Sequence, residues 1–273
     1  MLPGGAWDND LAGVDDMSSN VSDDSPCAFV TGGSRGVGAA TAIALAGLGY
    51  DVAIGYRNKA VRAEAIAGQI EAGGQRALLV GGDLTHDDGR AGMVTALSQW
   101  ARGLDVLVLN ASGGLERDLV AEDPDYPMRI NRDAQRDLLI AARPLLKPGA
   151  TVVFVTSHWA HRYGEVEQLP DYEPVASSKH GGENAVRALI PELATQHVRV
   201  LVVTGDLIEG TITAKLLERR NPGLKSTRSE TGGRATTTEE MGRAIANAVA
   251  DSTLQSGQTV VVGGALESLP LLA

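Results

Sequence analysis

Cysteine and positive charge are both scarce in this chain, and each scarcity excludes a class of protein. Cys27 is the only cysteine among 273 residues, so the chain cannot form an internal disulfide, which fits a reducing cytoplasm. Lysine and arginine number 24 against 34 aspartates and glutamates, giving a formal net charge of −10. This balance argues against nucleic acid or an anionic membrane as the main partner.

Long apolar stretches are also missing. No run approaches the roughly 18 apolar residues that a membrane-spanning helix needs, and the first residues lack the basic start and apolar stretch of a signal peptide. We therefore expect a cytoplasmic protein with no membrane partner. Residues 1–25 contain six aspartates and no lysine or arginine. We interpret them as a flexible acidic leader, with a short functional arm as the alternative.

The remaining residues, 26–273, alternate short apolar runs with helical patterns, and we expect them to form one domain. The apolar runs are residues 28–31, 52–56, 77–81, 106–110, 151–156, 198–204 and 259–262. They are rich in Val, Ile and Leu and do not alternate with polar residues, as expected for strands buried on both faces. Helical patterns lie between them at residues 39–48, 61–72 and 95–101. This order predicts a doubly wound α/β Rossmann fold with a single parallel sheet of about seven strands and helices on both faces.

One segment departs from this alternation. Residues 211–236 are polar, and we interpret them as a lid or a substrate-binding insertion, with an ordinary surface loop as the alternative.

A glycine-rich motif connects the first strand to the first helix. Residues 31–38 read Thr-Gly-Gly-Ser-Arg-Gly-Val-Gly. Glycines allow the backbone to turn tightly and approach a pyrophosphate, and the helix N-terminus offers free N–H groups. This spacing predicts a dinucleotide-binding loop.

The glycine motif resembles that of the short-chain dehydrogenase/reductase family, and the resemblance extends over nearly all of residues 27–268. Asp83 and Leu84 resemble the pair that meets the adenine. Asn110 stands in the family's Asn-Asn-Ala-Gly motif with Leu109 replacing the first Asn, so Asn110 alone has to fill its structural role. By this resemblance the cofactor contacts Gly32, Ser34, Arg35, Gly36, Val37, Gly38, Tyr56, Arg57, Asn58, Asp83, Leu84, Asn110, Ala111, Ser112, Lys179, Ile208 and Thr211.

Charge at the end of the second strand favours NADPH over NADH. Asp51 lies about 20 residues beyond the first glycine, where a ribose-binding acid often stands. It begins the strand, however, and the cofactor is expected beyond the carboxyl ends. At that end Arg57, together with Arg35 of the glycine loop, can bind a 2′-phosphate through charge-assisted hydrogen bonds. We therefore expect NADPH/NADP+ as the cofactor.

The strand at residues 151–156 ends in Ser157, which the resemblance makes the hydroxyl that holds the substrate oxygen. A serine at this place is also a common turn or cap residue. His158, Trp159, His161 and Tyr163 follow, and we interpret these four as substrate contacts, with His158 as a reserve proton donor. The two histidines lack the carboxylates or cysteines that would complete a metal site, so no metal is expected.

Tyr172 and Lys179 carry the expected chemistry in an unusual spacing. Family members usually have Tyr-x3-Lys, but Val175 occupies the position four before Lys179. Pro174 suits the first turn of a helix, which places Tyr172 just before the helix and Lys179 within it. A lysine ammonium near a phenol lowers the phenol's pKa, and the phenol can donate a proton to an oxygen that gains charge.

The Tyr-x6-Lys spacing resembles the NADPH-dependent enoyl-acyl-carrier-protein reductases of the III type. The resemblance implies catalytic roles for Ser157, Tyr172 and Lys179, with Asn131 supporting a water relay. Two features depart from that type: about five extra residues precede Tyr172, and Glu173-Pro174 follow it. Either change can move the phenol far enough to matter for catalysis.

We predict a reductase that transfers hydride from NADPH to an activated C=C (enoyl) or C=O group of a small organic or acyl molecule, with specialised metabolism as the candidate setting. The spacing favours the enoyl reaction over ketone reduction. Two alternatives remain: a ketoreductase whose proton donor is not a tyrosine, and an NADP(H)-binding sensor without catalysis. The resemblance further implies a homodimer or homotetramer.

Overall fold

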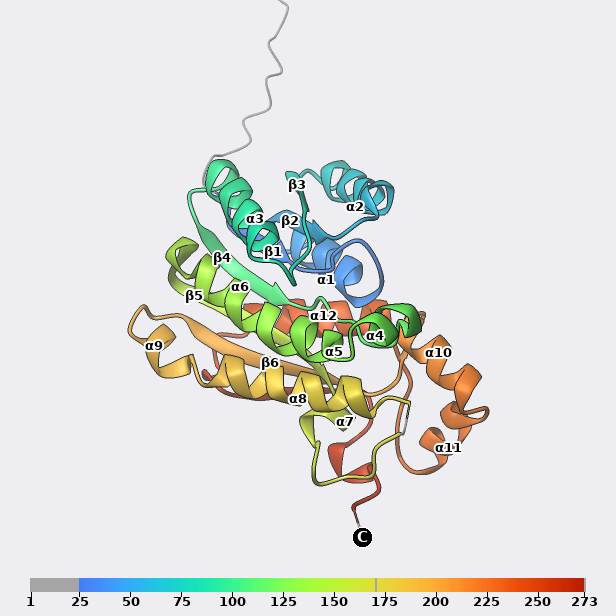
Figure 1. Ribbon diagram of the computed structural model, residues 1–273. Helices are drawn as coiled ribbons and strands as arrows, with labels where there is room; N and C mark the ends of the chain where they lie inside the picture. Colours follow the sequence, from blue (N-terminus) through green and yellow to red (C-terminus); the bar gives the residue numbers. More distant parts are fainter. Residues whose placement is uncertain (1–24, 170, 273) are drawn as a thin grey trace, which may run out of the picture.

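The computed structural model describes residues 25–169 and 171–272 (Figure 1). Its centre is a seven-stranded sheet in the order β3-β2-β1-β4-β5-β6-β9, and every neighbouring pair is parallel. The strands are β1 (Cys27–Val30), β2 (Asp51–Tyr56), β3 (Ala77–Gly81), β4 (Leu104–Leu109), β5 (Leu146–Ser157), β6 (Arg199–Gly205) and β9 (Thr259–Val262). The predicted doubly wound fold is confirmed.

Helices cover both faces of the sheet, as Figure 1 shows. One face carries α1 (Gly36–Ala46), α2 (Ala60–Ala72) and α12 (Thr238–Ala250), and the other carries α3 (Asp87–Trp100), α6 (Ala134–Ala142) and α8 (Glu173–Arg187). Each face has its own cluster of buried apolar side chains. The strands β1, β4, β5 and β6 contribute to both clusters, which explains why their sequences are continuously apolar.

All seven predicted runs form strands, and the largest difference from the predicted helices is the earlier start of α3. The pattern predicts a helix at residues 95–101, whereas α3 starts at Asp87. The first half of α3 contains Gly89 and Gly92, and it was not predicted as helix because glycine is a poor helix former. Gly89 is required by packing, since a Cβ at this position would lie 2.2 Å from the carbonyl oxygen of Asp83.

The lid (residues 211–236) is helical rather than an irregular loop. It contains α10 (Ile212–Arg220) and α11 (Leu224–Glu230). A two-stranded parallel ladder, β7 (Ile208–Glu209) with β8 (Thr236–Thr237), closes its base. In Figure 1 the two lid helices, in orange, stand out beside the end of the chain. β7 begins after only two residues beyond the end of β6, so the lid starts next to the carboxyl end of that strand.

Short elements complete the chain. They are α4 (Arg117–Glu122), α5 (Tyr126–Met128), the π-helical turn η1 (Arg129–Asp133), η2 (Arg143–Leu145), α7 (His158–His161), α9 (Ile190–Ala194) and η3 (Leu266–Ser268). Pro191 lies in the first turn of α9, and α8 has already ended at Arg187, as expected for a proline at this place.

The C-terminal segment (residues 263–272) folds back onto the extra residues between Ser157 and Tyr172. The backbone N–H of Glu167 donates to the carbonyl of Pro270 at 2.8 Å, and that of Leu272 donates to Glu165 at 3.1 Å. The insertion therefore has a backbone partner from the far end of the chain.

Two further expectations concern the acidic leader and membrane-spanning helices. Residues 1–24 of the acidic leader lie outside the described residues. Among the helices that are described, none is long and apolar enough to cross a membrane.

Gly242→Ala tests the close packing of α12 on α1. A methyl group at this position would lie 2.6 Å from the backbone carbonyl carbon of Ala40, so the helices would have to separate. We expect the free energy of unfolding to fall by about 1–3 kcal/mol, measured by urea unfolding. Gly68→Ala in α2 is the control, because nothing lies within 4 Å of its added methyl. Equal stability of the two variants would contradict the packing.

Candidate active site

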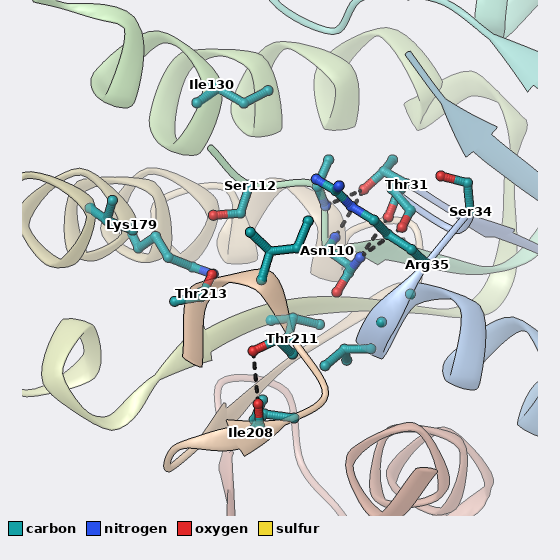
Figure 2. Close-up of a pocket in the computed structure, with 18 of the residues that line it drawn as sticks. Thr31, Ser34, Arg35, Asn110, Ser112, Ile130, Lys179, Ile208, Thr211 and Thr213 are labelled. Atoms are coloured by element: carbon teal, nitrogen blue, oxygen red, sulfur yellow. Dashed lines mark hydrogen bonds between the residues drawn. The ribbon is translucent and has the colours of Figure 1, made fainter. Parts of the chain in front are cut away.

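A cavity of about 530 Å³ opens at the carboxyl ends of the strands, beside the neighbouring strands β1 and β4, where the strand order of the sheet reverses. In a doubly wound sheet this is the place where consecutive connections diverge to opposite faces and leave a crevice. Figure 2 shows Ser34 and Arg35 on one side of this cavity and Lys179 on the other. Each of the seventeen residues that the resemblance assigned to the cofactor lines the cavity.

The glycine loop forms one end of the cavity and requires its glycines. Gly32 and Gly36 have φ of +64° and +56°, a left-handed conformation that other residues rarely adopt. At Gly38 a Cβ would lie 2.3 Å from the carbonyl oxygen of Gly32. The loop therefore brings its backbone and the N-terminus of α1 to the cavity surface.

Asn110 ties this loop to the end of β4. Its Nδ2 donates to the carbonyl oxygen of Thr31 at 2.9 Å, and its backbone N–H donates to the Thr31 hydroxyl at 2.9 Å (Figure 2). The backbone N–H of Ala111 donates to the same hydroxyl at 3.0 Å. Asn110 thus fills the structural role alone, as expected after the replacement of its neighbour by Leu109.

Positive side chains gather at the end of β2. Arg35, Arg57 and Lys59 all line this part of the cavity. Asp51 lies at the opposite end of β2, fully buried, where it accepts hydrogen bonds from the backbone and Nε of Arg76. The rejection of Asp51 as a ribose ligand is therefore confirmed.

Arg57 is held across the cavity by Tyr126 from α5. Its Nη1 donates to the Tyr126 hydroxyl at 2.9 Å and lies 3.9 Å from the Asp83 carboxylate. Burial works against ionisation of Asp83, but hydrogen bonds from Thr85 and the charge of Arg57 hold its pKa below the usual value. The sequence gives no sign of Tyr126, because α5 is a three-residue helix with no recognisable motif.

Ser157 and Tyr172 meet at the other end of the cavity. The Tyr172 hydroxyl donates to Ser157 Oγ at 2.9 Å. Ser157 Oγ also accepts from the backbone N–H of Ala160 and caps the short helix α7, so it is both a cap residue and a cavity residue. With both of these bonds accepted, the hydroxyl hydrogen of Ser157 remains available to a ligand.

Tyr172 reaches this position because the helix starts where Pro174 predicts. Tyr172 is the N-cap residue of α8, with Pro174 in the first turn. Val175, at the position where the family usually has tyrosine, is buried and forms part of the cavity wall. The seven-residue spacing therefore still brings the phenol and Lys179 into one cavity.

The pKa of Tyr172 is raised rather than lowered, which corrects the expectation from the sequence. Burial raises it, and the hydrogen bond with Ser157 offsets only part of that effect. The charge of Lys179 is not among the causes. Burial of the phenol favours its neutral form, so Tyr172 is protonated at neutral pH.

Lys179 extends from α8 into the cavity (Figure 2). Burial lowers the pKa of its ammonium from 10.5 to about 8. No hydrogen bond from its Nζ is found among the described residues, so the donors face the cavity rather than a protein partner. A bound ligand with hydroxyl oxygens would satisfy them.

Only one of the four predicted substrate contacts lines the cavity. Trp159 does so. His158 is fully buried behind the cavity, with Nε2 2.8 Å from the carbonyl oxygen of Gly264 and Nδ1 3.0 Å from the Thr204 hydroxyl. Burial lowers the pKa of His158. A neutral ring bound on both nitrogens has no proton to offer a substrate, so the role of reserve donor has to be abandoned.

His161 and Tyr163 also lie outside the cavity lining. His161 Nδ1 lies 2.9 Å from the buried carboxylate of Glu183. The Tyr163 hydroxyl donates to Glu173 on the outer side of α8. Their assignment as substrate contacts is therefore corrected, because the one-turn helix α7 directs only Trp159 toward the cavity.

Asn131 is a buried support rather than a cavity residue. Its Nδ2 donates to the carbonyl oxygen of Gly113 at 2.8 Å and to Ser178 Oγ at 2.9 Å. It lies in η1, and its own carbonyl oxygen packs so closely on α8 that a Cβ at Gly182 would lie 2.0 Å from it. Asn131 thus holds the loop after β4 against the helix that carries Lys179.

Ile208 and Thr211 line the cavity at the base of the lid. The Thr211 hydroxyl donates to the Ile208 carbonyl at 2.7 Å and accepts from the backbone N–H of Ala214, which caps α10 (Figure 2). This position fits the expected contact, while Glu116, Asp206 and Leu217 line the same cavity without any signal in the sequence. Within the described part of the chain, no cluster of His, Cys, Asp or Glu is suited to a metal ion.

Comparison with known proteins agrees with this geometry. A family model described as Enoyl-(Acyl carrier protein) reductase matches residues 32–266. The chain belongs to this family. It is therefore an oxidoreductase of the short-chain dehydrogenase/reductase type, as the glycine loop and the Ser-Tyr-Lys arrangement predicted.

Individual relatives catalyse reductions on different compounds. The chain is 27% identical to the 1-cyclohexenylcarbonyl-CoA reductase of Streptomyces collinus, over 87% of this chain and 85% of that protein. It is also 27% identical to versicolorin reductase 1 of Aspergillus parasiticus, over 71% and 73%. A short-chain dehydrogenase from Burkholderia cenocepacia, solved in complex with NADP, is 26% identical with a TM-score of 0.73, covering 89% of this chain and 98% of that one.

Lys179→Met tests the burial of the ammonium. Between pH 8 and 10.5 the unfolded chain keeps a proton that the folded chain has lost, so the free energy of unfolding of the wild type should rise with pH through this window. The methionine variant lacks this contribution, and we expect it to be the more stable protein at neutral pH, with the difference shrinking above pH 8. Urea unfolding across this pH range measures the difference, and parallel curves would contradict the lowered pKa.

Proposed function

We propose that this protein reduces an activated C=C or C=O group of a small molecule with NADPH, and that Ser157 and Tyr172 hold the carbonyl oxygen of the substrate. The observation that carries the proposal is the 2.9 Å hydrogen bond between these two hydroxyls, in the cavity that also contains Lys179 and the glycine loop. Two hydroxyls aimed at one point form a binding place for a single oxygen that gains negative charge.

The cavity fits NADPH, which would supply the hydride when bound. The left-handed backbone at Gly32 and Gly36, and the close contact of Gly38 with the Gly32 carbonyl oxygen, allow the loop backbone and the N-terminus of α1 to approach a pyrophosphate. Arg35 and Arg57 supply the positive charge that a 2′-phosphate requires. The buried hydroxyl of Thr156 lines the cavity and has no hydrogen-bond partner among the described residues, so a ligand can supply one.

The protonated Tyr172 is suited to reduction at neutral pH. As a substrate oxygen enters, the Tyr172 hydroxyl can turn from Ser157 and donate its proton, while Ser157 donates its own free hydrogen. The N–H donors of Lys179, which have no protein partner among the described residues, can bind the ribose hydroxyls. Asn131 holds the loop after β4 against α8 and so keeps Lys179 in a fixed position relative to that loop.

The part of the substrate that surrounds the reacting group is apolar and uncharged. Beyond Ser157 the cavity wall is formed by Trp159, Val175, Leu207 and Leu217, whereas the arginines lie at the cofactor end. These four belong to a separate apolar cluster between α8 and the lid. Such a wall suits a ring or short hydrocarbon chain and offers no partner for a carboxylate or a phosphate. A compound of specialised metabolism fits this description.

Enoyl reduction is the first candidate, because the Tyr-x6-Lys spacing and the matching family share it. Ketone reduction is the second, because the Ser157 hydroxyl beside Tyr172 suits the oxygen of a ketone as well as that of an enolate. To the proposal we add a single reductase domain at residues 26–273 and a cytoplasmic location, both inferred from the sequence, and a homodimer or homotetramer, inferred from the family resemblance.

Tyr172→Phe separates catalysis from mere cofactor binding. We expect NADPH oxidation to fall by at least about 10²-fold, because the proton donor is lost. The assay follows NADPH absorbance with a trans-2-enoyl thioester and a set of cyclic and aromatic ketones. Tyr163→Phe is the matched control, since this tyrosine lies outside the cavity, and it should keep the wild-type rate.

The outcomes of this assay distinguish the hypotheses. Activity on the thioester that disappears in the variant supports enoyl reduction, and activity on ketones alone supports the second candidate. A variant as active as the wild type would show that the donor is not Tyr172. NADPH binding with no turnover of any compound would favour the sensor.

Arg57→Ala tests the choice of cofactor. Removal of one charge-assisted hydrogen bond to the 2′-phosphate should reduce the preference for NADPH over NADH by at least about tenfold. The dissociation constants of both cofactors, measured by fluorescence titration, give this ratio directly. Arg62→Ala, which removes an exposed arginine of α2 that does not line the cavity, is the control. An unchanged ratio in Arg57→Ala would reject the 2′-phosphate contact.

A further inference from the structure

Arg228 is the only buried residue of the lid helix α11, and it is a charged one. Its side chain is 4% exposed, and that of its partner Asp206, which follows β6, is 0% exposed. Arg228 Nε donates to Asp206 Oδ1 at 3.0 Å, and Nη2 lies 2.9 Å from Oδ2. A buried ion pair is an unusual attachment for a short polar helix. Burial of two charges is unfavourable unless the geometry of the pair is good and further hydrogen bonds satisfy both groups.

The remaining nitrogens of Arg228 bind the C-terminal segment. Nη1 donates to the carbonyl oxygen of Ser268 at 2.8 Å, and Nη2 donates to the Ser268 hydroxyl at 2.8 Å. The guanidinium also lies over the ring of Trp159, 5.5 Å from its centroid. One side chain therefore joins the lid, the end of β6, the C-terminal segment and the residue that follows His158.

Two of these partners line the cavity although Arg228 does not. Trp159 forms the aromatic wall of the substrate end, and Asp206 lies beside Leu207, whose backbone N–H donates to Asp206 Oδ1 at 2.8 Å. Arg228, which lies outside the cavity lining, thus contacts one cavity residue after β5, Trp159, and one after β6, Asp206. A planar guanidinium can do this because it bonds along its edge and stacks with its face at the same time.

We propose that Arg228 is a positioning residue that determines which substrates fit, by holding Trp159 and the turn at Asp206 and Leu207 in place against the lid. The proposal rests on the proposed function in one respect: the cavity beyond Ser157 and Tyr172 has to be the substrate end. It differs from a purely structural role, which would change stability but leave the relative rates on different substrates unchanged.

Arg228→Lys is the variant of choice. It keeps the charge opposite Asp206, so the pair is not broken and the protein should fold, but an ammonium cannot bond Asp206 and Ser268 along one edge while stacking on Trp159. A second variant, Arg228→Met with Asp206→Leu, removes both charges together and avoids a lone buried carboxylate. Arg162→Lys is the matched control: Arg162 donates to the carbonyl oxygen of Leu266 in the same C-terminal segment and does not line the cavity.

The experiment compares kcat and KM for a short linear trans-2-enoyl thioester and for a cyclohexenyl thioester. We expect the ratio of their kcat/KM values to change by roughly tenfold in Arg228→Lys and in the double variant, the order of magnitude that a misfitting pocket wall produces. NADPH affinity, measured by fluorescence titration, should stay at the wild-type value, because the glycine loop is untouched. Arg162→Lys should keep the wild-type ratio.

A change in stability with an unchanged substrate ratio in both variants would overturn the proposal. A second readout does not depend on turnover: the emission of Trp159 and its quenching by acrylamide, isolated by subtracting the signal of Trp159→Phe. We expect stronger quenching in Arg228→Lys than in the wild type. If the wild type reduces neither compound, the proposed function fails on these substrates. The positioning role is then judged on Trp159 alone, and unchanged quenching overturns it.

Discussion

The separation of β1 from β4 at the carboxyl edge of the sheet is the constraint on which the active site depends. The two strands pair side by side, but the chain leaves β1 toward one face and β4 toward the other. The hydrogen bonds that Thr31 shares with Asn110 and Ala111 join the two sides of this crevice. These bonds set the distance between the glycine loop and the loop after β4, and so the width of the space that a dinucleotide enters.

At the other end of the cavity, the start of α8 determines the position of the Tyr172 phenol. Pro174 fixes the first turn of α8 and makes Tyr172 its N-cap, so the side chain leaves the backbone before the helical direction is established. The phenol can therefore reach Ser157 although Val175 occupies the usual place. The C-terminal segment holds the inserted residues after Ser157 through two backbone hydrogen bonds, one at Pro270 and one at Leu272.

The sequence predicts what short-range patterns encode. Strands buried on both faces are readable from continuous apolar runs, and the glycine loop from its spacing. The misplacement of His158 and the omission of Tyr126 have one cause: their decisive contacts join residues 106 and 69 positions apart, His158 with Gly264 and Tyr126 with Arg57. The lid was expected to be polar, but its attachment through a buried arginine cannot be inferred from composition, since Arg228 resembles its exposed neighbours in the sequence.

The electrostatics of the cavity favour one direction of reaction. Burial raises the pKa of Tyr172 and lowers that of Lys179 to about 8, so both shifts reduce the charge that the closed end of the cavity has to bury. A neutral phenol gives a proton to a substrate oxygen but cannot take one from an alcohol. In the proposed mechanism, the oxidative direction would first require deprotonation of Tyr172, which its raised pKa opposes. The same burial that keeps the phenol protonated at neutral pH therefore makes it a poor proton acceptor.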